Sequence, residues 1–194
     1  MNFDRWRHYA RGWLLHFLGR PEGAYRAYVE AFRADPRDAR PARHLAALAA
    51  ARRHWESAEH WLETVVALLP ESSDDWFNLG FVRDQAGKTE AALAAFAAAV
   101  RHNPAQDRAW YGMGLVQARL GRHAAAAATL REAARLQPLN GAAHYQLGMA
   151  LHHAGRPDEV ATVVARLRGI EPPRAQQLAR DAGRADLLAA DPPA

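Results

Sequence analysis

The sequence of 194 residues contains no cysteine. Disulfides, thiolate catalysis and cysteine-ligated zinc are therefore excluded. Long hydrophobic runs are missing as well. The longest bulky apolar stretch, residues 13–18, is far shorter than a membrane span and lacks the length and cleavage site of a signal peptide. We therefore expect a cytoplasmic protein without a membrane span.

Lysine is almost absent, because Lys88 is the only lysine among 25 basic residues. Two interpretations are open: the bias reflects a GC-rich genome, or arginine is retained because its planar guanidinium binds carboxylates and phosphates in bidentate fashion. The position of the arginines on the surface decides between them. The 25 basic residues face 21 acidic ones and form no concentrated run, so the sequence disfavours nucleic-acid binding despite a net charge of +4.

Catalytic and metal-binding patterns are also missing. The chain has ten histidines, but His152 and His153 are adjacent and point to different faces of a helix. No histidine pair at i, i+4 spacing is joined by a third ligand. No arrangement of serine, histidine and acid indicates a nucleophile. We therefore expect no enzyme, no cofactor and no metal site.

What recurs is a period of 34 residues, marked by Pro36, Pro70, Pro104, Pro138 and Pro172. A fixed period of this length indicates stacked supersecondary units. A small residue stands 24 positions before each proline, at Gly12, Ala46, Gly80, Gly114 and Gly148. A bulky apolar residue stands eight positions before it, at Tyr28, Leu62, Phe96, Leu130 and Val164. Apolar spacings of three and four predict two amphipathic helices per unit, which cross closely at the small residue.

Glycine and proline also mark the predicted helix ends. The turn between the two helices contains Gly19, Gly87, Gly121 or Gly155, and glycine suits a left-handed helix end. Pro21 and Pro157 suit the first turn of the helix that follows. The recurring proline is expected to end the second helix of each unit.

These residues resemble the tetratricopeptide repeat family. The third unit reads Trp76-Phe77-Asn78-Leu79-Gly80 and continues with Gly87, Ala92, Phe96 and Pro104, close to the family's pattern. The second unit departs most, with Ala42, Ala46 and Arg53 where the pattern has Trp, Gly and Gly. The resemblance implies an all-α, right-handed superhelical solenoid of five helix-turn-helix repeats, at residues 5–38, 39–72, 73–106, 107–140 and 141–174. A capping helix and short tail are expected at residues 175–194.

In that family the first helix of each unit lines a concave surface that binds extended peptides. The resemblance therefore implies a peptide-binding groove formed by Arg40, Arg43, His44, Phe77, Asn78, Phe81, Arg108, Tyr111, Arg119, Tyr145, Gln146 and Met149. Aromatic residues and arginine are the residue types that dominate protein interfaces. The competing interpretation is that several of these aromatic side chains only pack against the adjacent helix.

Some members of the family hold the C-terminal carboxylate of a peptide with a clamp of five side chains. Arg43, Asn78 and Arg108 occupy three of these positions, whereas Ala47 and Gly112 replace the other two donors. The resemblance thus retains carboxylate-binding chemistry only in part.

The sequence predicts a non-catalytic protein–protein interaction module: an adaptor, assembly factor or chaperone-like protein that binds an extended, acidic segment of another protein. The alternative is a self-assembling structural protein with head-to-tail contacts through its first repeat, which contains Trp6, Tyr9 and Trp13. Such contacts produce filaments when they do not close.

Overall fold

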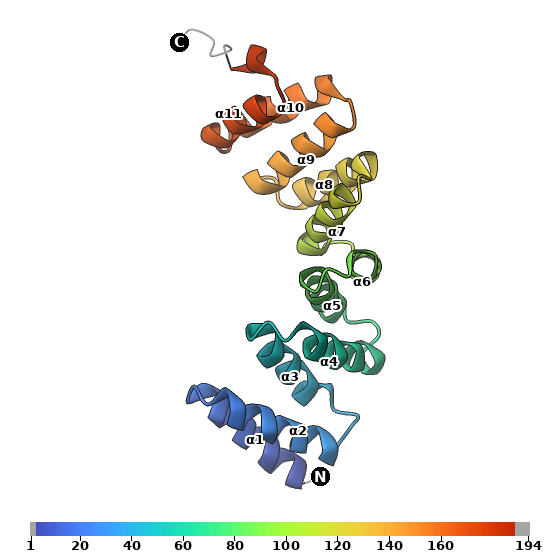
Figure 1. Cartoon of the computed structure of the whole chain (residues 1–194), viewed down its shortest axis with the longest axis vertical. Coiled ribbons are helices and arrows are strands. Elements are labelled where there is room, and N and C mark those ends of the chain that lie inside the picture. The colour runs from blue at the N-terminus through green and yellow to red at the C-terminus, as the bar shows by residue number, and fades with distance from the viewer. Residues whose placement is uncertain (1–2, 189–194) are drawn as a thin grey trace. The chain divides into compact units, whose positions relative to one another are not determined.

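The structure, a computed structural model, describes residues 3–188, so the end of the predicted tail (residues 189–194) lies outside the described residues. The described residues form helices and turns and no strand (Figure 1). The α-helices are α1 (Phe3–Phe17), α2 (Pro21–Ala34), α3 (Ala39–Ala51), α4 (Trp55–Leu68), α5 (Ser73–Gln85), α6 (Thr89–His102), α7 (Asp107–Arg119), α8 (His123–Leu136), α9 (Gly141–His153), α10 (Pro157–Arg168) and α11 (Pro172–Asp181). A short 3-10 helix, η1 (Ala185–Leu187), follows. The predicted all-α solenoid of helical repeats is confirmed.

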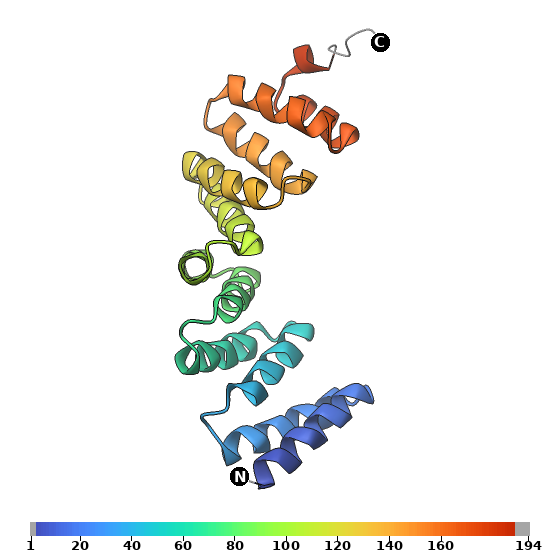
Figure 2. The ribbon, with the colours of Figure 1, turned by 180° about the vertical axis from the view of Figure 1, so that it is seen from behind.

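The chain divides into two compact units, Met1–His102 and Asn103–Ala194. In the first unit, three helix pairs (α1 with α2, α3 with α4, α5 with α6) pack in sequence, so that α2 lies against α3 and α4 against α5. In the second unit, α7 pairs with α8 and α9 with α10, while α11 lies against both α9 and α10 (Figure 2). Within each unit, an apolar helix face is buried only by a neighbour in the stack.

The turns inside the helix pairs have the predicted left-handed backbone. Gly19, Gly87, Gly121 and Gly155 all have φ between 67° and 75°. Arg53 occupies the same place in the second repeat and has φ of 59°. A left-handed residue that carries a Cβ costs about 1–2 kcal/mol relative to glycine, so the departure of Arg53 from the pattern strains a turn and leaves the fold intact.

Close helix crossings occur where the small and bulky residues recur. A Cβ atom added to Gly12 would lie 2.8 Å from the ring of Tyr28. A Cβ atom added to Gly80 would lie 2.7 Å from the ring of Phe96, and one added to Gly114 would lie 2.5 Å from the side chain of Leu130. The recurring small residue therefore removes a side chain at the point where the bulky residue of the same repeat packs.

The loops before the third, fourth and fifth repeats are held by one recurring hydrogen bond. Trp76 Nε1 donates to the carbonyl oxygen of Pro70 over 2.7 Å, and Trp110 Nε1 donates to that of Pro104 over 2.9 Å. His144, at the same place in the next repeat, has Nε2 3.1 Å from the carbonyl oxygen of Pro138. In the third, fourth and fifth repeats, a side chain in the first turn of the first helix thus binds the loop that precedes it.

The C-terminal end differs from the prediction in one respect. Pro172 was expected to end a helix, but α10 already ends at Arg168 and Pro172 is the first residue of α11. Proline suits this position because its fixed φ matches the first turn and its missing N–H would have no helical partner. Leu178 of α11 packs directly on Gly148 of α9, and both Leu178 and Val164 belong to the buried core of the second unit.

No helix within residues 3–188 combines the length and the apolar character that a membrane crossing requires.

Candidate functional site

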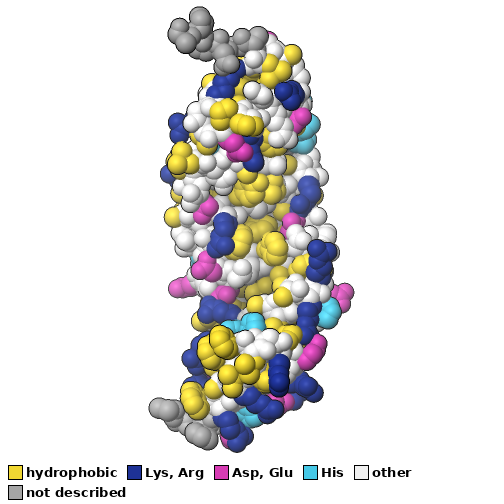
Figure 3. Space-filling model, turned by 90° about the vertical axis from the view of Figure 1, so that its left-hand side faces the viewer, with side chains coloured by type: hydrophobic (Ala, Val, Ile, Leu, Met, Phe, Trp, Pro, Cys, Tyr) yellow, Lys and Arg dark blue, Asp and Glu magenta, His cyan; other side chains and the backbone are white. Residues whose placement is uncertain are grey.

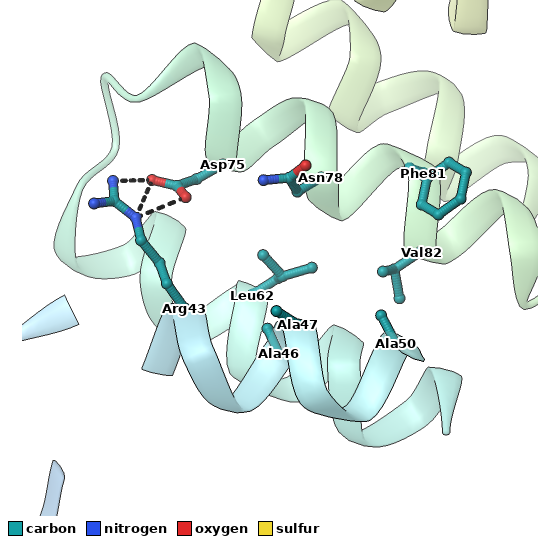
Figure 4. Close-up of a pocket in the computed structure, with 9 residues that line it drawn as sticks. All are labelled: Arg43, Ala46, Ala47, Ala50, Leu62, Asp75, Asn78, Phe81 and Val82. Atoms are coloured by element: carbon teal, nitrogen blue, oxygen red, sulfur yellow. Dashed lines mark hydrogen bonds and ion pairs between the residues drawn. The ribbon is translucent and has the colours of Figure 1, made fainter. Parts of the chain in front are cut away.

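A pocket of about 300 Å³ lies between α3, α4 and α5 in the first unit (Figure 4). We call it the Ala47 pocket; its lining residues are Arg43, Ala46, Ala47, Ala50, Leu62, Asp75, Asn78, Phe81 and Val82. It brings together three of the residues that the sequence predicted for the groove, namely Arg43, Asn78 and Phe81. The other lining residues were not predicted.

The pocket exists because one position of the repeat is small. The residues at the place of Ala47 in the other repeats are Trp13, Phe81, Leu115 and Met149. In the second repeat, alanine leaves that volume empty, and the buried side chains of Leu62 and Val82 are reached from outside. This exception in an otherwise bulky column was the sequence signal that could have located the pocket.

One side of the pocket carries an ion pair between neighbouring repeats. Arg43 Nε on α3 lies 2.9 Å and 3.1 Å from the two carboxylate oxygens of Asp75 on α5, and its Nη2 donates to Oδ2 (Figure 4). Asp75 is only 3% exposed, and its hydrogen bonds raise the pKa of the Arg43 guanidinium. The charge of Arg43, which was expected to meet an acidic ligand, is thus already balanced inside the protein.

We expect the replacement of Arg43 by alanine to destabilise the protein by roughly 1–3 kcal/mol, because the buried carboxylate of Asp75 loses its partner. The replacement of both Arg43 and Asp75 by alanine should restore part of this loss, and a double-mutant cycle in urea measures the coupling. Arg33→Ala, which removes an exposed pair with Glu30, is the control and should cost at most about 1 kcal/mol. Equal costs for Arg43→Ala and Arg33→Ala would contradict the role given to the Arg43–Asp75 pair.

Two further side chains of α5 at the pocket, Asn78 and Phe81, are exposed to solvent (Figure 4). Asn78 is exposed and forms no hydrogen bond with the described residues, so its amide offers both a donor and an acceptor. Phe81 is 46% exposed at the rim. Phe77, also predicted for the groove, is half-buried and its ring centroid lies 5.8 Å from that of Phe96, so it packs within its own repeat.

Arg40 and His44 lie outside the Ala47 pocket. Arg40 makes a bidentate contact with Asp38, the N-cap of α3, and its guanidinium carbon lies 5.4 Å from the centre of the Tyr9 ring. His44 Nε2 lies 3.0 Å from the Tyr9 hydroxyl, and its ring stacks on Tyr28 at 4.6 Å. Both residues therefore help to fix the first helix pair on α3.

Stability is expected to depend on pH through His44. Burial, followed by the charge of His16, lowers the pKa of His44 below its ordinary value of 6.5. The groups that face it are Tyr9 and His16 from α1 and Tyr28 from α2. Because His44 binds a proton more readily in the unfolded chain than in the folded one, its protonation favours unfolding. The stabilisation that neutral His44 contributes is therefore complete above pH 6.5 and is lost as the pH falls through the lower pKa that His44 has in the folded protein.

The thermal midpoint should therefore fall between pH 7 and pH 5, and His44→Gln, which cannot titrate, should flatten this dependence. The measurement is circular dichroism melting across that pH range. His54→Gln is the control, since His54 is exposed at the start of α4. A His44→Gln profile as steep as that of the control would exclude His44 as the source.

In the second unit, a pocket of about 390 Å³ lies between α7, α8 and α9. It is lined by four predicted residues (Arg119, Tyr145, Gln146 and Met149) together with Ala118, His123, Ala150 and His153. The Tyr145 hydroxyl donates to Asp181 over 2.6 Å, and this hydrogen bond, with burial and the carboxylate charge, raises the pKa of Tyr145 to about 12. Tyr145 is therefore held by the C-terminal helix.

The remaining predicted residues, Arg108 and Tyr111, line neither pocket. Tyr111 packs against the buried core of the second unit, which raises the pKa of its hydroxyl, and Arg108 is exposed near the start of α7. The rings of His123 and His153 are 4.9 Å apart. Among residues 3–188, no group of three or more histidine, aspartate or glutamate side chains is placed to hold a metal ion.

Comparison with solved structures shows the same fold in several proteins. A crystal structure of MamA superposes with a TM-score of 0.80 at 22% identity and covers 99% of this chain and 100% of its own. YrrB, described as a TPR protein with an unusual peptide-binding site, gives 0.77 at 19% identity, covering 91% and 90%. Residues 41 to the end of MamA from Desulfovibrio magneticus RS-1 give 0.75 at 22% identity, covering 93% and 98%. No protein with a curated functional description matches the sequence.

Two family models, both described as tetratricopeptide repeat, match residues 45–110 and 117–182. These segments cover about two thirds of the chain and all residues that line the two pockets except Arg43. Repeats of this fold serve as protein-interaction modules. The helix pairs have the predicted period, and close crossings at glycine recur. Together with these two matches, these features show that the protein belongs to the tetratricopeptide repeat family.

Proposed function

We propose that the protein is a non-catalytic adaptor or assembly factor that binds an extended segment of another protein. An apolar side chain of that bound segment enters the Ala47 pocket. The observation that carries this proposal is the opening beside Ala47, which exposes an apolar floor between two first helices. About 300 Å³ is at the small end of ligand pockets, and it suits one large side chain rather than a whole small molecule.

The residues around the opening suit a peptide backbone. Asn78 stands beside the pocket with its amide group unused by the described residues. One amide both donates to a backbone carbonyl and accepts from a backbone N–H, as an extended segment requires. Phe81, exposed at the rim, adds apolar area around the anchoring side chain.

The charges favour an apolar anchor over an acidic one at this pocket. Arg43 is paired with Asp75, and Arg40 with Asp38. An acidic group that bound Arg43 would compete with a buried carboxylate that is already in place. We therefore assign specificity at the Ala47 pocket to shape and apolar contact. The acidic or C-terminal carboxylate ligand and the cytoplasmic location stay predictions.

A pocket-filling substitution tests the proposal. We expect peptides selected on the wild-type protein from a random display library to share a large apolar residue. Ala47→Leu should weaken their binding at least tenfold, about 1.4 kcal/mol, because leucine occupies the space of the anchor. The thermal midpoint of Ala47→Leu should equal that of the wild-type protein, since the fourth and fifth repeats have Leu115 and Met149 at this position.

Ala128→Leu is the matched control, because Ala128 is an exposed alanine on α8 in the second unit. It should bind the selected peptides as the wild-type protein does. If titration calorimetry shows that the folded Ala47→Leu variant binds the selected peptides as tightly as the wild-type protein, the Ala47 pocket is not part of the interaction surface.

A further inference from the structure

The first helix presents a large apolar face that the described part of the chain leaves uncovered. Among the side chains of residues 4–188, nine large hydrophobic ones are exposed, and five of these belong to α1 or to the residue after it: Trp6, Trp13, Leu14, Phe17 and Leu18, with exposed fractions between 50% and 76%. At 100° per residue, Trp6, Trp13 and Phe17 lie along one line of the helix, and the rings of Trp13 and Phe17 stack 5.7 Å apart. Clustered exposure of this kind marks an interaction site rather than scattered surface residues.

Positive charge is concentrated at the same place. Residues 3–34 contain six arginines and three carboxylates, so this helix pair carries +3 of the net charge of +4. Arg7 and Arg11 share a helical row with Leu14 and Leu18, at spacings of four, three and four residues. Arg11 is exposed, as is Arg20 beyond the helix end, and neither is paired with the described residues. Figure 3 shows hydrophobic and basic side chains side by side at the N-terminal end of the molecule, at the bottom of the view.

We propose that α1 binds the surface of an anionic membrane. Trp6, Trp13 and Phe17 enter the boundary between headgroups and acyl chains, while Arg11 and Arg20 contact lipid phosphates. A helix with tryptophan and phenylalanine on one face, and with arginine beside leucine on the flank of that face, has the composition of helices that lie in the plane of the interface. Tryptophan suits this depth because its ring is largely apolar and its N–H is polar.

The fold presents this face ready for binding. Other residues of α1 are packed on its neighbours, Gly12 against Tyr28 of α2 and Tyr9 against His44 of α3. Isolated amphipathic helices must be ordered as they adsorb, and that ordering opposes binding. In this protein the helix is already formed and oriented.

The charges favour a membrane over a second copy of the same face. A symmetric dimer places one surface patch against itself, so two unpaired Arg11 side chains and their neighbours would meet like charges. The carboxylate on this helix is Asp4, and it already lies 3.3 Å from Arg7. Anionic lipids supply the opposite charge that the face does not contain, and each basic residue near such a surface adds to the attraction.

Vesicle flotation tests this proposal. We expect the full chain to float with vesicles of phosphatidylcholine and phosphatidylglycerol in about equal amounts, to float poorly with phosphatidylcholine alone, and to be released by added salt. Trp13→Ser combined with Phe17→Ser should lower partitioning at least tenfold, and Arg11→Glu should lower it on anionic vesicles. Lipids brominated on their acyl chains should quench the tryptophan fluorescence of the wild-type protein, and less so after Trp13→Phe.

Two controls match these variants outside the first helix pair. Leu139→Ser removes a side chain that is 79% exposed, and Arg101→Glu changes the net charge equally at the exposed end of α6. Both should partition as the wild-type protein does. The proposal is overturned if the wild-type protein does not bind the anionic vesicles. It is also overturned if the α1 variants and the controls lose vesicle partitioning to the same extent. Concentration-dependent light scattering that Trp13→Ser with Phe17→Ser abolishes, without vesicle binding, would assign the face to a second copy instead.

Discussion

Replacement of Leu178 by alanine is expected to lower the free energy of unfolding by about 2–5 kcal/mol. Leu178 is fully buried, and its side chain fills the space that Gly148 leaves on α9. In the three repeats with Gly12, Gly80 and Gly114, the bulky residue of the same repeat fills this space. In the fifth repeat, α11 supplies the side chain, so truncation of Leu178 opens a cavity at the contact that joins the C-terminal helix to the stack.

Urea unfolding followed by circular dichroism measures this effect, with Gln177→Ala as the control because Gln177 is the exposed neighbour on α11. The loss should also reach α9, since stability in a stack depends on contacts between neighbours. Amide exchange in α9 should therefore become faster in Leu178→Ala. If Leu178→Ala and Gln177→Ala unfold at the same urea concentration, α11 is not part of the core.

Gly80→Leu should also destabilise the protein, with an expected cost of roughly 1–3 kcal/mol. Even a Cβ atom at this position would lie 2.7 Å from Cδ1 of Phe96, so a leucine must push α5 and α6 apart. The thermal midpoint should fall clearly, whereas Gln85→Leu, at the exposed end of α5, should leave it nearly unchanged.

The second repeat provides the matching rescue. It has Ala46 and Leu62 where the third has Gly80 and Phe96. We therefore expect Gly80→Ala combined with Phe96→Leu to be more stable than Gly80→Ala alone, because the smaller partner makes room for the methyl group. A purely additive loss in the double variant would show that the two positions do not share one packing site.

Much of the fold was determined by the sequence alone, because the elements of a repeat protein depend on short-range patterns. Prolines 34 residues apart set the period, and glycines such as Gly87 and Gly155 were correctly predicted to adopt a left-handed backbone. The pairing of Gly80 with Phe96 follows from helical periodicity within a single repeat. In each case the interacting groups are at most about half a repeat apart, and the backbone preference is intrinsic to the residue.

The candidate site was decided by tertiary structure. The sequence identified Arg43, Asn78 and Phe81 as residues of first helices, but it could not show that Asp75 on the next repeat would neutralise Arg43. Nor could it show that α11 would replace Val164 at Gly148. These contacts join different repeats, and they depend on which side chains of two stacked helices meet. The Ala47 pocket has the same origin: it is a volume left by one small residue, and a volume has boundaries only when the neighbouring helices are in place.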